Sequence, residues 1–249
     1  MLLQLQTWPE VEAYLRRSRG IIVPIGSTEQ HGPIGLIGTD AICAEIVARA
    51  VGEAASAMVA PTLPIGMAQH HLAFPGSISL RPSTLIAVVR DCVASLARHG
   101  FERFYFVNGH GGNIASLGAA FSEIYAEASL KAPGGAPGVK CRLKNWWQAP
   151  RLMETVRELF GEGEGTHATP SEISLTWFAH PERAQPGRAL EPRIAPRGTF
   201  ADAEDYRRNF PDGRIGSDSA LANSEAGKRI FDLSVEGLSA DYRSWLAEA

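Results

Sequence analysis

Apolar and polar positions along the chain follow two periods, one typical of buried strands and one of amphipathic helices. Continuous apolar runs predict strands over residues 20–26, 57–65, 103–107 and 139–144. Apolar residues at helical spacing predict helices over residues 8–18, 40–51, 83–98, 114–130 and 223–247. Strands that alternate with helices indicate an α/β fold, a mostly parallel sheet sandwiched between helices.

The remaining segments complete this picture. Residues 181–216 are rich in proline, glycine and charge with little periodicity, so they predict long surface loops, which are often functional or lie at subunit contacts. Residues 131–138 predict a further loop. The chain has no internal repeat or low-complexity linker, so we expect a single domain over residues 1–249.

Composition narrows the class of partner. The 249 residues carry 24 Lys and Arg against 27 Asp and Glu, a net charge of −3, without a basic run. We therefore expect a small-molecule substrate and no nucleic acid. No apolar run reaches transmembrane length and the N-terminus does not resemble a signal peptide, so no membrane contact is expected. The widely spaced Cys43, Cys92 and Cys141 predict free thiols in the reducing cytoplasm.

Polar side chains follow two of the predicted strands. The strand at 20–26 leads to Glu29 and His31, and the strand at 103–107 leads to His110. Parallel sheets bind ligands outside the carboxyl ends of their strands, so both groups are expected in one site. Residues two apart in extended chain point the same way, which brings Glu29 and His31 together. Carboxylates and imidazoles without cysteine are typical of a hydrolytic Zn²⁺ or Mn²⁺ centre.

Other candidates have more than one interpretation. The glycines of residues 108–113 fit neither nucleotide-binding pattern, so we interpret them as relief of crowding around His110. Asp40 has the position of a helix N-cap as much as that of a ligand. Glu172 has the spacing of a first-turn residue, where the helix dipole favours a carboxylate. His167 follows a glycine-rich segment that suits a proton-transfer group.

Several separated motifs resemble the creatininase family. They are Ile25-Gly26-Ser27-Thr28-Glu29-Gln30-His31-Gly32-Pro33 with Gly38-Thr39-Asp40, His71 before Phe74-Pro75-Gly76, Asn108-Gly109-His110-Gly111-Gly112-Asn113, His167-Ala168 with Glu172, and Gly213 to Gly216 with Asp218. They occur in the family's order over nearly the whole chain, which makes the resemblance specific.

This resemblance implies an α/β fold, frequent assembly as a homohexamer, and a centre of two Zn²⁺ or Mn²⁺ ions that hydrolyses amide-type C–N bonds. By the same resemblance, Asp40 matches the carboxylate that bridges the two metals. Glu29 and His110 match ligands of one metal, and His31 matches a ligand of the other. His167 matches the histidine assigned to proton transfer or substrate contact.

The chain also departs from creatininase. Gly111 and Gly112 stand where creatininase has a Tyr and a Glu, and that Glu is a metal ligand. We expect Glu172 to replace it as a metal ligand and also to act as a catalytic residue. These departures count against creatinine itself as the substrate. The residues expected to line the substrate pocket are His71, Gly111, Trp146 and Trp147, with core packing an equal alternative for the two tryptophans.

The sequence thus predicts a metal-dependent hydrolase that cleaves an amide C–N bond of a small, possibly cyclic substrate with water activated by two metals. A formamide deformylase, a peptidase or a lactonase of the same family is the alternative within the enzyme class. A non-catalytic protein that binds metal or another ligand is the alternative outside it.

Overall fold

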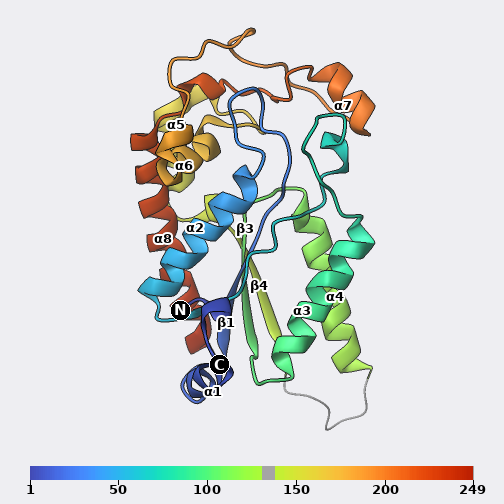
Figure 1. The fold of residues 1–249 in the computed structure, drawn as a ribbon, viewed down its shortest axis with the longest axis vertical. Coiled ribbons are helices and arrows are strands. Elements are labelled where there is room, and N and C mark those ends of the chain that lie inside the picture. Colours follow the sequence, from blue (N-terminus) through green and yellow to red (C-terminus); the bar gives the residue numbers. More distant parts are fainter. Residues whose placement is uncertain (131–137, 249) are drawn as a thin grey trace.

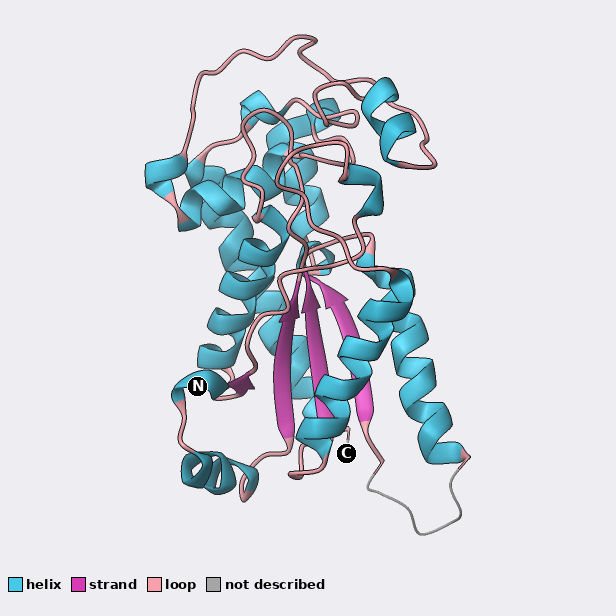
Figure 2. Cartoon of the chain, turned by 45° about the vertical axis from the view of Figure 1, so that its right-hand side comes forward, coloured by secondary structure: helices cyan, strands magenta, loops and turns pink. Residues whose placement is uncertain are grey.

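A four-stranded parallel sheet lies at the centre of the protein. The structure is a computed structural model that describes residues 1–130 and 138–248. The strands are β1 (Gly20–Ile25), β2 (Met58–Val59), β3 (Arg103–Asn108) and β4 (Lys140–Asn145), in the order β2-β1-β3-β4. Each neighbouring pair is parallel, and Ile22 lies beside Tyr105, which lies beside Arg142. The strands β1, β3 and β4 therefore end at one edge, where Figure 2 shows their arrowheads directed toward a group of loops.

Helices cover both faces of the sheet (Figure 1). Side chains alternate along β1, so Ile22 faces one apolar core while Ile21 and Val23 face the other. The first core is formed with α2 (Thr39–Ala54), α5 (Leu152–Phe160), α6 (Pro170–Ala179) and α8 (Ser224–Ala247). The second is formed with α1 (Trp8–Leu15), α3 (Pro82–Ala97) and α4 (Asn113–Ser129). The expected single-domain α/β fold is confirmed.

The prediction of a strand over residues 57–65 is largely wrong. Pairing stops after Val59, and only Leu63 returns to the sheet, as an isolated bridge with Ile25. Pro61 and Pro64 have no N–H to donate to a neighbouring strand, which explains the early end of β2.

The prediction of loops over residues 181–216 holds for most of that segment but misses one helix. Helix α7 (Ala203–Asn209) begins after Asp202, whose side chain accepts a hydrogen bond from the backbone N–H of Asp205. A seven-residue helix is too short to establish a periodic apolar pattern, so its cap is the main local signal. The loop expected at 131–138 falls almost wholly outside the described residues. Within the described part of the chain, no helix has the length and apolar character needed to cross a membrane.

Candidate metal centre

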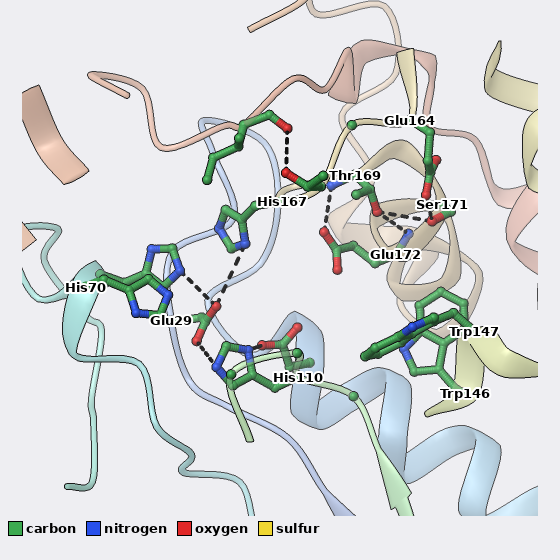
Figure 3. Close-up of a pocket in the computed structure, with 18 of the residues that line it drawn as sticks. Glu29, His70, His110, Trp146, Trp147, Glu164, His167, Thr169, Ser171 and Glu172 are labelled. Carbon is green, nitrogen blue, oxygen red and sulfur yellow. Dashed lines mark hydrogen bonds and ion pairs between the residues drawn. The ribbon is translucent and has the colours of Figure 1, made fainter. Parts of the chain in front are cut away.

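Five ionisable side chains meet beyond the carboxyl ends of β1 and β3. Glu29 and His31 come from the segment after β1, and His110 comes from the loop after β3 (Figure 3). Asp40 lies in the first turn of α2 and Glu172 in the first turn of α6. Glu29, His31, Asp40 and His110 are almost completely buried. The structure therefore brings together all five residues expected to bind metal.

These side chains form two overlapping groups that share Asp40. Glu29, Asp40 and His110 offer ligand atoms that all lie within 4.8 Å of one another, and so do His31, Asp40 and Glu172. Asp40 Oδ2 is 2.9 Å from His110 Nδ1, whereas Asp40 Oδ1 is 3.1 Å from His31 Nε2. Each group therefore receives one oxygen of Asp40, as a carboxylate that bridges two cations would provide.

Two oxygens in this cluster face nitrogens without accepting a hydrogen bond. Glu29 Oε1 is 3.1 Å from His71 Nε2, and Asp40 Oδ2 is close to His110 Nδ1. Yet neither oxygen accepts a hydrogen bond with suitable geometry from any residue that the structure describes. Ligand atoms that converge in this way concentrate buried negative charge, which a bound cation would compensate. The oxygen and imidazole set fits Zn²⁺ or Mn²⁺.

The imidazoles of the metal-free cluster take up protons. Burial disfavours the charged form of His31, but Asp40, Glu172 and Glu29 outweigh it and raise the pKa of His31 to about 10. Burial also opposes charging of His110, yet Glu29 and Asp40 raise its pKa to about 9. Protons thus supply part of the positive charge that the carboxylates require, and a bound metal would displace them.

The structure decides between the interpretations of Asp40 and Glu172. Gly38 is the N-cap of α2, and the carboxylate of Asp40 faces the histidines, so the capping interpretation of Asp40 is wrong. Glu172 fits both of its interpretations, as a residue of the first helical turn and as a candidate metal ligand. Its Oε1 accepts a hydrogen bond of 2.6 Å from the backbone N–H of Thr169, while its Oε2 lies 3.8 Å from His31 Nε2.

Two glycines of the loop after β3 are required by close packing. A Cβ atom at Gly109 would overlap the carbonyl oxygen of Asp40, and one at Gly112 would overlap His110 Nε2. A Cβ atom at Gly111, in contrast, would meet nothing within 4 Å. The interpretation of this loop as relief of crowding therefore holds at Gly109 and Gly112.

Two further histidines, His71 and His167, lie beside the cluster. His167 Nε2 is 2.9 Å from the carbonyl oxygen of Gln30, and its Nδ1 is 3.9 Å from Glu29 Oε1. The rings of His71 and His167 stack with centroids 4.4 Å apart. Burial lowers the pKa of His167 well below its usual range and, with His70 and other cations nearby, lowers the pKa of His71 to about 2. Both rings are therefore neutral at pH 7.

Gln30 is a residue of this site that the sequence reasoning passed over. Its side-chain amide nitrogen lies 2.9 Å from His71 Nδ1 and 3.0 Å from the carbonyl oxygen of Gly213. A donor at Nδ1 leaves the His71 proton on Nε2, which faces Glu29. The position of Gln30 between Glu29 and His31 in the motif was the available signal.

A cavity of about 490 Å³ opens onto the cluster. His71, Gly111, Trp146 and Trp147 line it, as expected. Trp146 is also 3% exposed and belongs to the core between the sheet and α8, so both interpretations of this residue hold. Several further lining residues were not predicted from the sequence, because they come from α5, the segment before α6 and the long C-terminal segment. These are Met153, Val156, Glu164, Phe200 and Tyr206.

Comparisons with known proteins identify the family. The family described as "Creatininase: Creatinine amidohydrolase" matches residues 4–241. The chain is 27% identical to creatinine amidohydrolase of Pseudomonas putida, over 93% of this chain and 92% of that protein. It is 35% identical to mycofactocin precursor peptide peptidase of Mycobacterium tuberculosis, over 93% of this chain and 87% of the relative.

The fold is also similar to that of a solved structure. A structure named "Creatininase Mn" superposes with a TM-score of 0.88 at 25% identity, with 98% of both chains covered. The family match and this superposition both extend over nearly the full length of the chain. The chain belongs to the creatininase family and is a hydrolase of that family.

Proposed function

We propose that the protein hydrolyses an amide C–N bond of a small substrate with the help of two divalent cations. The observation that carries this proposal is the position of Asp40 between two groups of ligand atoms. Glu29, His110 and Asp40 Oδ2 would hold one cation, and His31, Glu172 and Asp40 Oδ1 the other. Zn²⁺ or Mn²⁺ bound there supplies a water nucleophile at neutral pH and polarises the substrate carbonyl.

His167 is the proposed proton-transfer group. Its Nε2 lies 2.9 Å from the carbonyl oxygen of Gln30, and the tautomer that donates to this oxygen has its Nδ1 lone pair on the side of Glu29. A neutral imidazole at this position can accept a proton and deliver it to the leaving nitrogen. The proton is needed because an amide nitrogen departs poorly as an anion. His71, Gly111, Trp146 and Trp147 would bind and orient the substrate in the cavity.

The relatives bear on the type of bond that the protein cleaves. Relatives named creatinine amidohydrolase and mycofactocin precursor peptide peptidase support an amide-type bond. Formamides and lactones are open to the same carbonyl chemistry, so a deformylase or lactonase is the second candidate. Glycine at position 112, in place of the glutamate of creatininase, favours a substrate other than creatinine.

Metal stoichiometry tests the assignment of ligands. We expect elemental analysis to find two metals per chain in the wild-type protein, about one in Glu172→Gln and less than one in Asp40→Ala. Glu45→Gln provides a matched control, because Glu45 lies on the same helix as Asp40 but pairs with Arg49 away from the cluster. Two metals per chain in Asp40→Ala would refute the shared-carboxylate arrangement.

Activity tests the reaction. Exhaustive chelation should abolish turnover of the best substrate in a panel of creatinine, formylated amines, peptides and lactones, and Zn²⁺ or Mn²⁺ should restore it. Full activity of the metal-free protein would refute the mechanism. A protein that binds two metals and turns over no member of the panel would instead favour the non-catalytic alternative. We also infer a homohexamer from the family resemblance, which mass photometry can test.

A further inference from the structure

The cavity has two chemically different ends. In Figure 3, Glu29 and His110 lie on the side of the candidate metal centre, whereas Glu164, Trp146 and Trp147 are drawn on the opposite side. All of these side chains line the same cavity. Glu164 belongs to neither of the groups that share Asp40, so its carboxylate needs an explanation other than metal binding.

Glu164 carries an oxygen that has no partner. It lies between a short 3-10 helix (Gly161–Gly163) and α6. Its Oε1 accepts a short hydrogen bond from the hydroxyl of Ser171. Its Oε2 is buried and accepts no hydrogen bond from the described residues. An unpaired buried carboxylate oxygen is costly, and because Glu164 lines the cavity, a cationic ligand group placed beside it would compensate the charge.

The surroundings of Glu164 favour a cationic ligand group. Among the residues that the structure describes, none of those that line the cavity is a lysine or an arginine. Other parts of the cavity wall are aromatic and apolar, formed by Trp146, Trp147, Met153 and Val156. A planar or compact cation gains from an indole face as well as from a carboxylate, whereas an anionic group would find only repulsion from Glu164.

We propose that Glu164 and the two tryptophans form a subsite for a positively charged, N–H-bearing group of the substrate, such as an ammonium, amidinium or guanidinium. This inference rests on the proposed amide hydrolysis, because it assigns the part of the substrate that lies beyond the scissile bond. The subsite determines specificity, and Glu164 takes no part in bond cleavage.

The competing explanation is that Glu164 only orients its neighbour. Ser171 Oγ also lies 3.1 Å from Thr169 Oγ1, and the backbone N–H of Thr169 donates a hydrogen bond to Glu172 Oε1. In that case, any variant that breaks the contact between Glu164 and Ser171 would disturb the metal centre, whatever the charge of the ligand.

A pair of isosteric probes separates charge recognition from shape. We expect zinc-loaded wild-type protein to bind phenylguanidinium about tenfold or more tighter than the neutral phenylurea, measured by isothermal titration calorimetry near pH 7.5. In Glu164→Gln the preference should fall to about twofold or less, while the affinity for phenylurea changes little. The matched control is Glu162→Gln, which removes an exposed carboxylate two residues earlier and should keep the wild-type preference.

Further measurements distinguish the proposed subsite from the competing explanation. Ser171→Ala removes the hydroxyl but keeps the carboxylate, so the preference for phenylguanidinium should persist. The inference is overturned if wild type shows no such preference, if it does not bind phenylguanidinium at millimolar concentration, or if Glu164→Gln weakens both probes equally. Zinc content and amide turnover, measured on the same preparations, report separately on the proposed function. Two metals and active hydrolysis without cation preference would refute the subsite alone.

Discussion

Replacement of Glu164 by glutamine is expected to stabilise the protein in a pH-dependent way. Burial raises the pKa of Glu164 to about 7 from its ordinary value of 4.5, although the hydrogen bond from Ser171 opposes the change. The folded chain therefore holds this carboxyl protonated over a range of pH in which the unfolded chain releases the proton. Glutamine keeps the size of the side chain and carries no charge at any pH.

The sign follows from the direction of the pKa change. An acid whose pKa is higher in the folded state contributes stability below the unfolded pKa and loses it as pH rises through the folded pKa. The loss is nearly complete one to two pH units above 7. Between about pH 5 and about pH 8.5, the stability of Glu164→Gln relative to wild type should therefore rise by about 2 to 3 kcal/mol.

Urea unfolding of metal-free protein, followed by tryptophan fluorescence, measures this difference at both pH values. The lost hydrogen bond to Ser171 contributes a constant offset, so only the change with pH reports on the carboxylate. Glu162→Gln is the control, because it removes an exposed carboxylate two residues away and leaves Glu164 in place. The stability difference between Glu164→Gln and wild type could instead stay constant, or fall, from about pH 5 to about pH 8.5. Either result would show that burial does not raise the pKa of Glu164.

Three further substitutions test the packing of the loop after β3 and the hydrogen bonds of the buried Arg214. Gly109→Ala should lower metal content at least severalfold, because its methyl group would displace the backbone of Asp40, whereas Gly111→Ala should leave metal content unchanged. Equal metal content in the two variants would contradict this explanation. Arg214→Met should lower the free energy of unfolding by about 3 kcal/mol, because the buried guanidinium donates to the carbonyls of Pro192, Arg193 and Ser217. Urea unfolding would measure this loss, and a change under about 0.5 kcal/mol would show that the contacts contribute little.

The main elements of the fold could be predicted from local patterns. Residues 20–25 and 103–108 form central strands buried on both faces, and such strands appear in the sequence as continuous apolar runs. The long helices carry apolar stripes because one side of each packs on the sheet. Strand β2 was predicted too long, because apolar composition continues through Pro61 and Pro64, which have no N–H for regular strand pairing.

Part of the site was also accessible in this way. Glu29, His31 and His110 follow strands that end at one edge of a parallel sheet, so their convergence follows from topology. Asp40 was ambiguous because a cap and a ligand in the first turn of a helix have the same local sequence. Only the direction of its carboxylate, toward His31 and His110, decides the matter.

The sequence by itself therefore determined the parallel α/β architecture and the polar residues that follow its strands. The tertiary structure alone decided which oxygen of Asp40 faces which histidine, that Glu172 turns one oxygen toward the cluster, and that Glu164 is buried at the cavity wall. The physical reason is the distance along the chain over which each interaction acts. Periodicity and capping arise within a few residues, whereas burial and convergence depend on segments that are distant along the chain and meet only when the helices have packed on the sheet.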